Sequence, residues 1–216
     1  MLFRSLLDIL YPPTCVTCGE DGSWFCDACQ RSVFSYHQAQ ESISPFSSII
    51  TTGSYANPKL RQMLTTFKYH SASCLQGSWE IWLKRFRDQY AEPWPWANLS
   101  ELVVTSIPGD PRRLRERGMD HASLLADMVT RSLVPWAQRE TLLQRVKHLR
   151  ANATLPADAT RQVNIRGAFS IIHPVHAPVL LIDDILTTGA TAQEAARMLL
   201  AAGAPSVHLF TIAKGK

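Results

Sequence analysis

Residues 179–191 read Val179-Leu-Leu-Ile-Asp-Asp-Ile-Leu-Thr-Thr-Gly-Ala-Thr191, and this order predicts a buried strand, a short loop and the start of a helix. The apolar run after Pro178 has the length of a strand that is covered on both faces. Small and apolar residues at helical spacing follow between Ala192 and Ala202. Asp183 and Asp184 fall at the carboxyl end of this strand, which is where open α/β sheets bind their ligands.

The loop between this strand and the helix suits a phosphate group. Its threonines offer hydroxyls, and backbone N–H groups at a helix start add the positive end of the helix dipole. The two carboxylates just before the loop suit a diol or a metal-bound sugar. Together they predict a site for ribose 5-phosphate, against the plainer alternative of an ordinary strand–turn–helix with two solvated acids.

Residues 182–191 resemble the loop of type I phosphoribosyltransferases that binds 5-phosphoribosyl 1-pyrophosphate (PRPP). The resemblance implies that Asp183 and Asp184 hold the ribose 2′- and 3′-hydroxyls. It also implies that the 5-phosphate is wrapped by Thr187, Thr188, Gly189, Ala190 and Thr191.

Composition indicates a globular protein of one to two domains. The chain has 216 residues, of which 46% are hydrophobic and 19% charged. The formal net charge of +4 permits a phosphate-rich ligand or a nucleic acid and requires neither.

The first ten residues are apolar but do not resemble a signal peptide. They are short, carry Arg4 inside, and run into Tyr11-Pro12-Pro13 without a small-residue cleavage site. We expect a short amphipathic helix here. No stretch of about 18 apolar residues is present, so the sequence predicts a cytoplasmic protein without a membrane span.

Two Cys-x-x-Cys pairs surround a glycine-containing hairpin and predict a closed metal site. The thiolates of Cys15, Cys18, Cys26 and Cys29 can meet at tetrahedral distance around zinc. With every position filled by protein, such a site is structural. A redox pair or disulfides are the alternatives, and a reducing compartment makes disulfides the weaker one. Cys74 stands apart, and we assign it no role.

Two helices are predicted between the cysteines and Pro93. Residues 58–69 have apolar side chains at helical spacing, and Lys68 near their end is a candidate phosphate or DNA contact. Its alternative is a plain basic amphipathic helix. An aromatic stripe from Leu75 to Tyr90 favours core packing over a platform for stacked bases. We expect a linker from Arg31 to Ser48 and a strand within 49–54.

A basic loop is expected after the predicted strand Leu102–Ile107. Residues 112–118 read Arg-Arg-Leu-Arg-Glu-Arg-Gly, and guanidinium groups there can grip pyrophosphate oxygens bidentately. Arg112, Arg113 and Arg117 are the candidate clamp, with a solvated basic turn as the alternative. A helix follows over about 120–132.

The remaining elements complete an alternating pattern. A weak edge strand is expected within 142–149, a mobile loop over 150–161 that carries Arg150, a strand at 169–172 and a final strand at 206–212. Arg150 is a second candidate for a phosphate or DNA contact.

The whole chain resembles the ComF (also called GntX) family. The matching motifs are the stretch from Tyr11 through Cys29, Phe67-Lys-Tyr69, Ile107-Pro108, Arg117-Gly118, Arg161 with Asn164, Gly167-Ala-Phe169 and residues 183–191. The resemblance implies an α/β type I phosphoribosyltransferase fold, with a central mainly parallel sheet, flanking helices and a small N-terminal zinc subdomain. We expect three parts: 1–40 with the cysteines, 41–95 as a connecting helical region, and 96–216 as the phosphoribosyltransferase-like domain.

The resemblance also implies PRPP with Mg²⁺ as ligand and a link to DNA uptake in natural transformation. Two departures put the transferred group in doubt: Met119-Asp120-His121 replaces the family's Asn-Gln, and 152–156 lack its Gln. Three functions stay open. One is a phosphoribosyltransferase, and the second is a binding module for single-stranded DNA or a nucleotide that uses the same cradle, with DNA-uptake proteins as partners. In the third, PRPP is a regulatory ligand. The acceptor substrate is not specified by any motif.

Overall fold

The computed structural model describes residues 12–33, 37–39, 43–69, 72–89, 94–146 and 165–215. Their elements follow in chain order: α2 (Asp27–Val33), β1 (His37–Ala39), β2 (Ser48–Thr51), α3 (Pro58–Tyr69), α4 (Ala72–Gln89), β3 (Val103–Ser106), α5 (Pro111–Arg117), α6 (His121–Leu133), β4 (Gln138–Arg139), β5 (Leu143–Arg145), β6 (Phe169–Ile171), β7 (Val179–Leu186), α8 (Ala190–Ala201) and β8 (Val207–Lys214).

A central, mainly parallel sheet organises these elements. Its strand order is β1-β2-β8-β7-β3-β4, and only the edge strand β1 runs antiparallel to its neighbour. The longest strands, β7 and β8, lie side by side in the middle. The predicted fold class, a parallel sheet with flanking helices, is confirmed.

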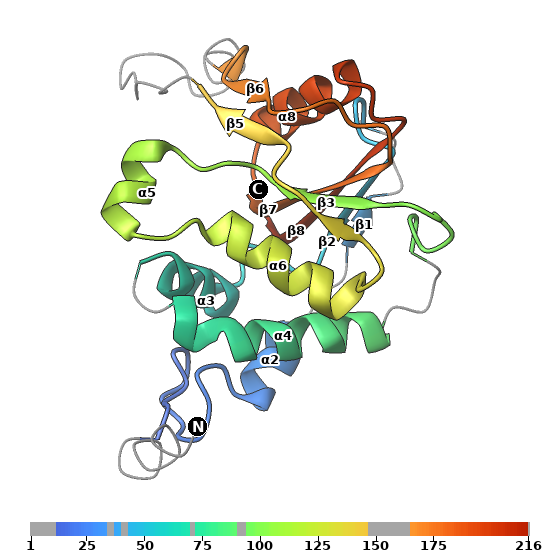
Figure 1. Cartoon of the computed structure of the whole chain (residues 1–216). Coiled ribbons are helices and arrows are strands. Elements are labelled where there is room, and N and C mark those ends of the chain that lie inside the picture. The colour runs from blue at the N-terminus through green and yellow to red at the C-terminus, as the bar shows by residue number, and fades with distance from the viewer. Residues whose placement is uncertain are drawn as a thin grey trace, which may run out of the picture.

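Helices cover the two faces of the sheet separately (Figure 1). Helices α3, α4 and α6 lie on one side and α8 on the other. Alternate residues of β7 supply both layers: Leu180 and Ile182 join the core under α3, α4 and α6, while Val179 and Leu181 join the core under α8. This double burial explains why residues 179–182 form an uninterrupted apolar run.

Two local expectations were wrong. The basic segment after β3 is not a loop, because residues 111–117 form α5. Asp110 caps that helix by accepting from the backbone N–H of Arg112, Pro111 begins it, and Gly118 ends it at φ 69°. The stretch expected as a linker from Arg31 contains the end of α2 and the strand β1.

The strand expected within 142–149 lies outside the main sheet. As β5 it pairs antiparallel with β6 in a separate two-stranded sheet. The expected mobile loop, with Arg150, and the N-terminal amphipathic helix lie outside the described residues.

Candidate functional site

The carboxyl end of β7 is the centre of the candidate site. Residues 179–182 of this strand are buried, whereas residues 183–186 are partly exposed. Its neighbours β3 and β8 run parallel to it, so all three strands end at the same edge of the sheet. The backbone therefore leaves the core where the acid pair begins, as the sequence predicted.

The acid pair carries one internal counterion. The Lys68 ammonium, at the end of α3, lies 2.8 Å from Oδ2 of Asp184, and both side chains are largely buried. Asp183 Oδ1 accepts a hydrogen bond of 2.8 Å from the backbone N–H of Asp184. The structure thus brings Lys68 to the acid pair, where it faces a carboxylate of the same site.

The two carboxyl groups differ in their surroundings. The pKa of Asp183 is raised to about 8, first because the group is largely removed from water and second because Asp184 is negatively charged. The Lys68 ammonium opposes this rise, and the charge of Asp120 adds to it. The raised pKa favours the protonated form of the Asp183 carboxyl group near neutral pH.

Asp120 was not among the sequence candidates. It caps α6, where its Oδ1 accepts from the N–H groups of Ala122 and Ser123 at 3.1 and 3.2 Å. The following residue, His121, meets Phe67 edge to face, with ring centroids 5.3 Å apart. These contacts fix the start of α6 beside the end of α3, and so beside Lys68. The Asp-His sequence that departs from the family motif therefore has a structural function.

The loop after the acid pair forms a small hollow. Gly189 adopts φ 76° as the N-cap of α8, a conformation that side chains rarely allow, and the Thr188 hydroxyl oxygen accepts from the backbone N–H of Ala190 at 3.5 Å. A hollow of about 50 Å³ is lined by Asp183 and by residues 185–192. Since about 10–15 Å³ suffices for one water-sized group, the hollow has room for the oxygens of a phosphate. Asp183, the predicted loop residues and the helix start thus share one hollow.

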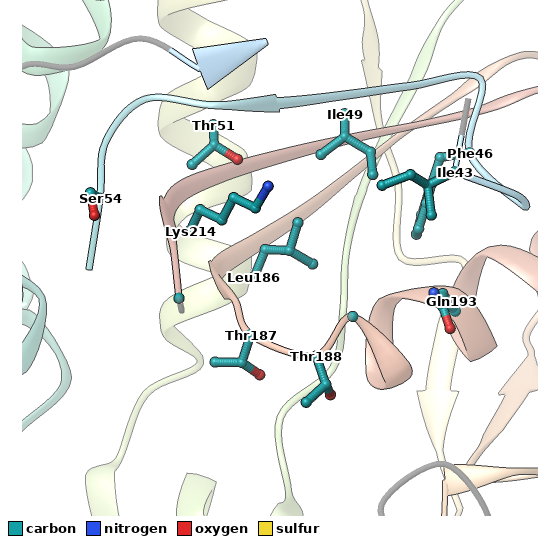
Figure 2. A pocket seen from close by; sticks show the side chains of 12 residues that line it. Ile43, Phe46, Ile49, Thr51, Ser54, Leu186, Thr187, Thr188, Gln193 and Lys214 are labelled. Carbon is teal, nitrogen blue, oxygen red and sulfur yellow. The ribbon is translucent and has the colours of Figure 1, made fainter. Parts of the chain in front are cut away.

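A larger pocket of about 460 Å³ lies against the same loop (Figure 2). It is bounded by β2 and the chain on either side of it, the loop, the start of α8 and the end of β8. Its lining residues are Ile43, Phe46, Ile49, Thr51, Ser54, Leu186, Thr187, Thr188, Gly189, Gln193, Lys214 and Gly215. None of the residues from β2 or β8 was a sequence candidate.

The arginine clamp is only partly described. Arg112, Arg113 and Arg117 all belong to α5, which follows the carboxyl end of β3. The Arg112 side chain is exposed, and its backbone N–H is held by Asp110 at 2.9 Å. The side chains of the other two lie outside the described part of the structure, so the clamp stays a prediction.

The four cysteines form a cluster that can bind a metal ion such as zinc. The sulfur atoms of Cys15, Cys18, Cys26 and Cys29 lie within 4.8 Å of one another, and none is in a disulfide. Zinc–sulfur bonds of about 2.3 Å place tetrahedral sulfurs about 3.8 Å apart, and the Cys18 and Cys26 sulfurs are 3.6 Å apart. The backbone N–H of Cys26 donates to the Cys15 sulfur at 3.4 Å, which favours a thiolate. This donor set fits zinc.

Among the described residues, no helix is both long and apolar enough to cross a bilayer.

The chain is similar to curated proteins with DNA-related names. It is 27% identical to DNA utilization protein YhgH of Escherichia coli K12 over 173 residues, which are 79% of this chain and 73% of that protein. It is 26% identical to Competence protein F of Haemophilus influenzae over 216 residues, which are 94% of this chain and 85% of that protein. No family model matches the chain.

Among solved structures, the chain is similar to glutamine phosphoribosylpyrophosphate amidotransferase of B. subtilis in complex with ADP and GMP. The TM-score is 0.40 with 16% sequence identity, and the match covers 68% of this chain. The chain spans 30% of the length of that protein.

Proposed function

Because relatives named Competence protein F and YhgH, aligned over most of the chain, support its place in the ComF family, we propose that it binds a 5-phosphorylated ribose ligand, with PRPP as the first candidate. The phosphate would occupy the hollow over residues 187–191. Asp183 and Asp184 would accept the ribose hydroxyls. From the names of these relatives, we also propose a role connected with DNA uptake or utilization. A cytoplasmic location is a separate proposal that rests on the sequence.

The hollow is the observation that carries this proposal. It combines the start of a twelve-residue helix, a glycine in the left-handed conformation and threonine hydroxyls. Each of these features favours an anion with several oxygens. The same hollow includes Asp183, so a phosphate and an acid lie within the reach of one small sugar.

Chemistry at this site would depend on charge stabilisation. When pyrophosphate leaves the ribose, negative charge develops on its oxygens, and Arg112, Arg113 and Arg117 are the residues that we propose to stabilise it. Bound Mg²⁺ would supply further positive charge to the pyrophosphate. The acid pair would hold the ribose in place while the bond to pyrophosphate breaks. Transferase activity is thus part of the proposal, with its acceptor unassigned.

Titration calorimetry with ribose 5-phosphate and with PRPP–Mg²⁺ tests the proposal. We expect wild-type protein to bind both, and Asp183→Asn with Asp184→Asn to weaken binding by about tenfold or more, since charge-assisted hydrogen bonds are lost. Gly189→Ala should also weaken ligand binding relative to the wild type, because any side chain is strained at φ 76°. Asp88→Asn, an exposed carboxylate on α4, is the matched control. Equal binding by wild type and the double variant would refute the assignment.

A second candidate function is a binding module for single-stranded DNA. It is favoured by the name DNA utilization protein among the relatives and by the net charge of +4. DNA held through phosphates would lose affinity steeply with salt. If Asp183→Asn with Asp184→Asn abolishes PRPP binding and leaves DNA binding intact, the two ligands have separate sites. A wild-type protein that binds DNA but no ribose phosphate would favour the module alone.

A further inference from the structure

The larger pocket and the small hollow share loop residues 186–189, and the pocket extends from there toward β2 and the end of β8. In Figure 2 the hydroxyls of Thr187 and Thr188 point away from Ile49 and Phe46, whereas the side chains of Leu186 and Lys214 extend toward them. A ligand packed against Ile49 and Phe46 would therefore contact the loop through Leu186 and would not use the two threonine hydroxyls.

One wall of the pocket is apolar. Phe46 and Ile49 are each 4% exposed and belong to the core under α8, while Ile43 at the rim is 40% exposed. Leu186 completes this surface from the end of β7. The pocket volume of about 460 Å³ falls in the range of small-molecule sites. Such a wall favours a flat apolar ring over a chain of hydroxyls.

Two polar side chains in the pocket have no partner in the described part of the structure. Lys214 ends β8, and none of the described carboxylates lies within ion-pair distance of its ammonium. Gln193, in the first turn of α8, makes only backbone hydrogen bonds there. An ammonium attracts an anion, and a carboxamide offers a donor and an acceptor side by side, as the edge of a nucleobase requires.

We propose that this pocket is a binding site for a nucleoside 5′-monophosphate, separate from the ribose phosphate site. The base packs between Phe46, Ile49 and Ile43, and its edge pairs with the Gln193 carboxamide. The phosphate pairs with the Lys214 ammonium. This site goes beyond the proposed function, because it needs neither the acid pair nor the threonine hydroxyls.

The two sites share one element. Leu186, Thr187, Thr188 and Gly189 line both the pocket and the hollow, and the N–H of Gly215 donates to the carbonyl of Leu186 at 2.6 Å. An occupant of the pocket therefore contacts the same loop that lines the hollow. We expect each ligand to change the affinity of the other by the same factor, as linkage requires.

The test uses adenosine 5′-monophosphate as probe, with titration calorimetry and saturation-transfer NMR. In the presence of saturating ribose 5-phosphate, wild-type protein should still bind the nucleotide. The NMR experiment should then show transfer of saturation from the protein to the protons of the base. Lys214→Met and Gln193→Leu should each weaken binding by about tenfold, as the loss of a charged or paired hydrogen bond predicts. Ile43→Trp should block the pocket at its rim without touching the core.

Matched controls lie on α4, across the sheet from the pocket. Lys84→Met and Ile81→Trp change exposed residues of the same types and should leave nucleotide binding unchanged. The proposal is overturned if wild-type protein does not bind the nucleotide. Equal binding by the three pocket variants, or complete displacement by ribose 5-phosphate, would overturn it too. If only the proposed function is wrong, ribose 5-phosphate does not bind, but the pocket variants still bind the nucleotide more weakly than the control variants do.

Discussion

Lys68, Asp184 and Asp183 form an electrostatically incomplete group at the end of β7. Two carboxyl groups share one ammonium, which lies 2.8 Å from Asp184. The cost of this arrangement falls on Asp183, whose pKa rises to about 8 because it is withdrawn from water beside another acid. A carboxyl group with so perturbed a pKa, next to a second acid and a lysine, is typical of functional sites.

Asp183→Asn should stabilise the protein, and increasingly so as the pH rises. The ordinary pKa of 3.8 applies to the unfolded chain, and the folded value is about 8. Between these values the folded state holds more protons, so wild-type stability falls from about pH 4 to pH 8. Asn removes this loss and still accepts from the Asp184 N–H. Four pKa units correspond to about 5 kcal/mol, which is the upper bound on the gain that we expect at pH 8.

Thermal unfolding at pH 5 and pH 8 measures this effect. The gap between variant and wild type should be small at pH 5 and larger at pH 8. Asp88→Asn, whose carboxylate is exposed, should follow the wild type at both pH values. A gap that does not change with pH would show that Asp183 titrates normally in the folded protein.

Lys68→Met should destabilise the protein, because it leaves the acid pair without a counterion. Removing one partner of a largely buried pair is costly, and we expect a loss of about 2–3 kcal/mol at pH 8. A double-mutant cycle with Asp184→Asn isolates the pairwise energy, measured by urea unfolding. Lys59→Met on the same helix is the control, since the Lys59 ammonium donates to the Ser32 hydroxyl and forms no ion pair with any described carboxylate. A coupling energy near zero would mean that the pair does not stabilise the fold.

At the scale of elements, periodicity and composition predicted the long segments and missed the short ones. The strand β7 and helices α3, α4, α6 and α8 were predicted because each repeats one pattern over a strand's or helix's length. Helix α5 was missed because its charges suggested a loop. Its end signals, Asp110, Pro111 and Gly118, were nevertheless in the sequence.

The site residues also divide into those that the sequence predicts and those that it does not. Asp183, Asp184 and the loop could be predicted because strand, acids and loop are contiguous. Lys214 could have been found by applying the same edge rule to the last strand. The pairing of Lys68 with Asp184 could not, because it depends on how α3 packs over the sheet. Contacts between segments so distant in the chain carry no local pattern.

Asp110→Ala should loosen α5 locally. The Asp110 side chain satisfies the Arg112 N–H at 2.9 Å, and losing an N-cap costs about 1 kcal/mol. In a helix of seven residues this loss is large enough to expose the first turn. Hydrogen exchange of the α5 amides should speed up about fivefold, whereas Asp110→Asn, which keeps the cap, should not change it. Unchanged exchange in the alanine variant would show that α5 does not depend on its cap.

At the scale of the molecule, the cysteine cluster is joined to the main core. Cys15, Phe25, Cys29 and Val33 belong to the same buried cluster as α3, α4 and the sheet. Phe25 stacks on Trp82 of α4, with ring centroids 6.0 Å apart, and Asp27 of α2 pairs with Arg85 of α4. The predicted division into 1–40, 41–95 and 96–216 stays a prediction. The shared core links the stability of the first part to that of the rest.

Removal of the metal should therefore destabilise the whole protein. Without an ion, no metal bonds hold the four sulfur atoms within 4.8 Å of one another. Cys15 and Cys29, both buried in the shared core, then lose the bonds that fix their positions. We expect metal analysis to give one zinc per chain, and a chelator or Cys29→Ser to lower the melting temperature by about 10 °C or more. Because Phe25 and Trp82 belong to one core, tryptophan fluorescence and far-UV circular dichroism should report the same transition.

Cys74→Ser is the matched control for this experiment. Cys74 is exposed and lies outside the metal-binding group, so its loss should leave both the zinc content and the melting temperature unchanged. A Cys29→Ser protein that loses zinc but melts with the wild type would show that the cysteine cluster folds independently of the sheet. Two separate unfolding transitions would also show that the cysteine cluster folds independently of the sheet. A single lowered transition requires that the contacts of Phe25 with α4 transmit the loss of the metal to the sheet and to the site at the end of β7.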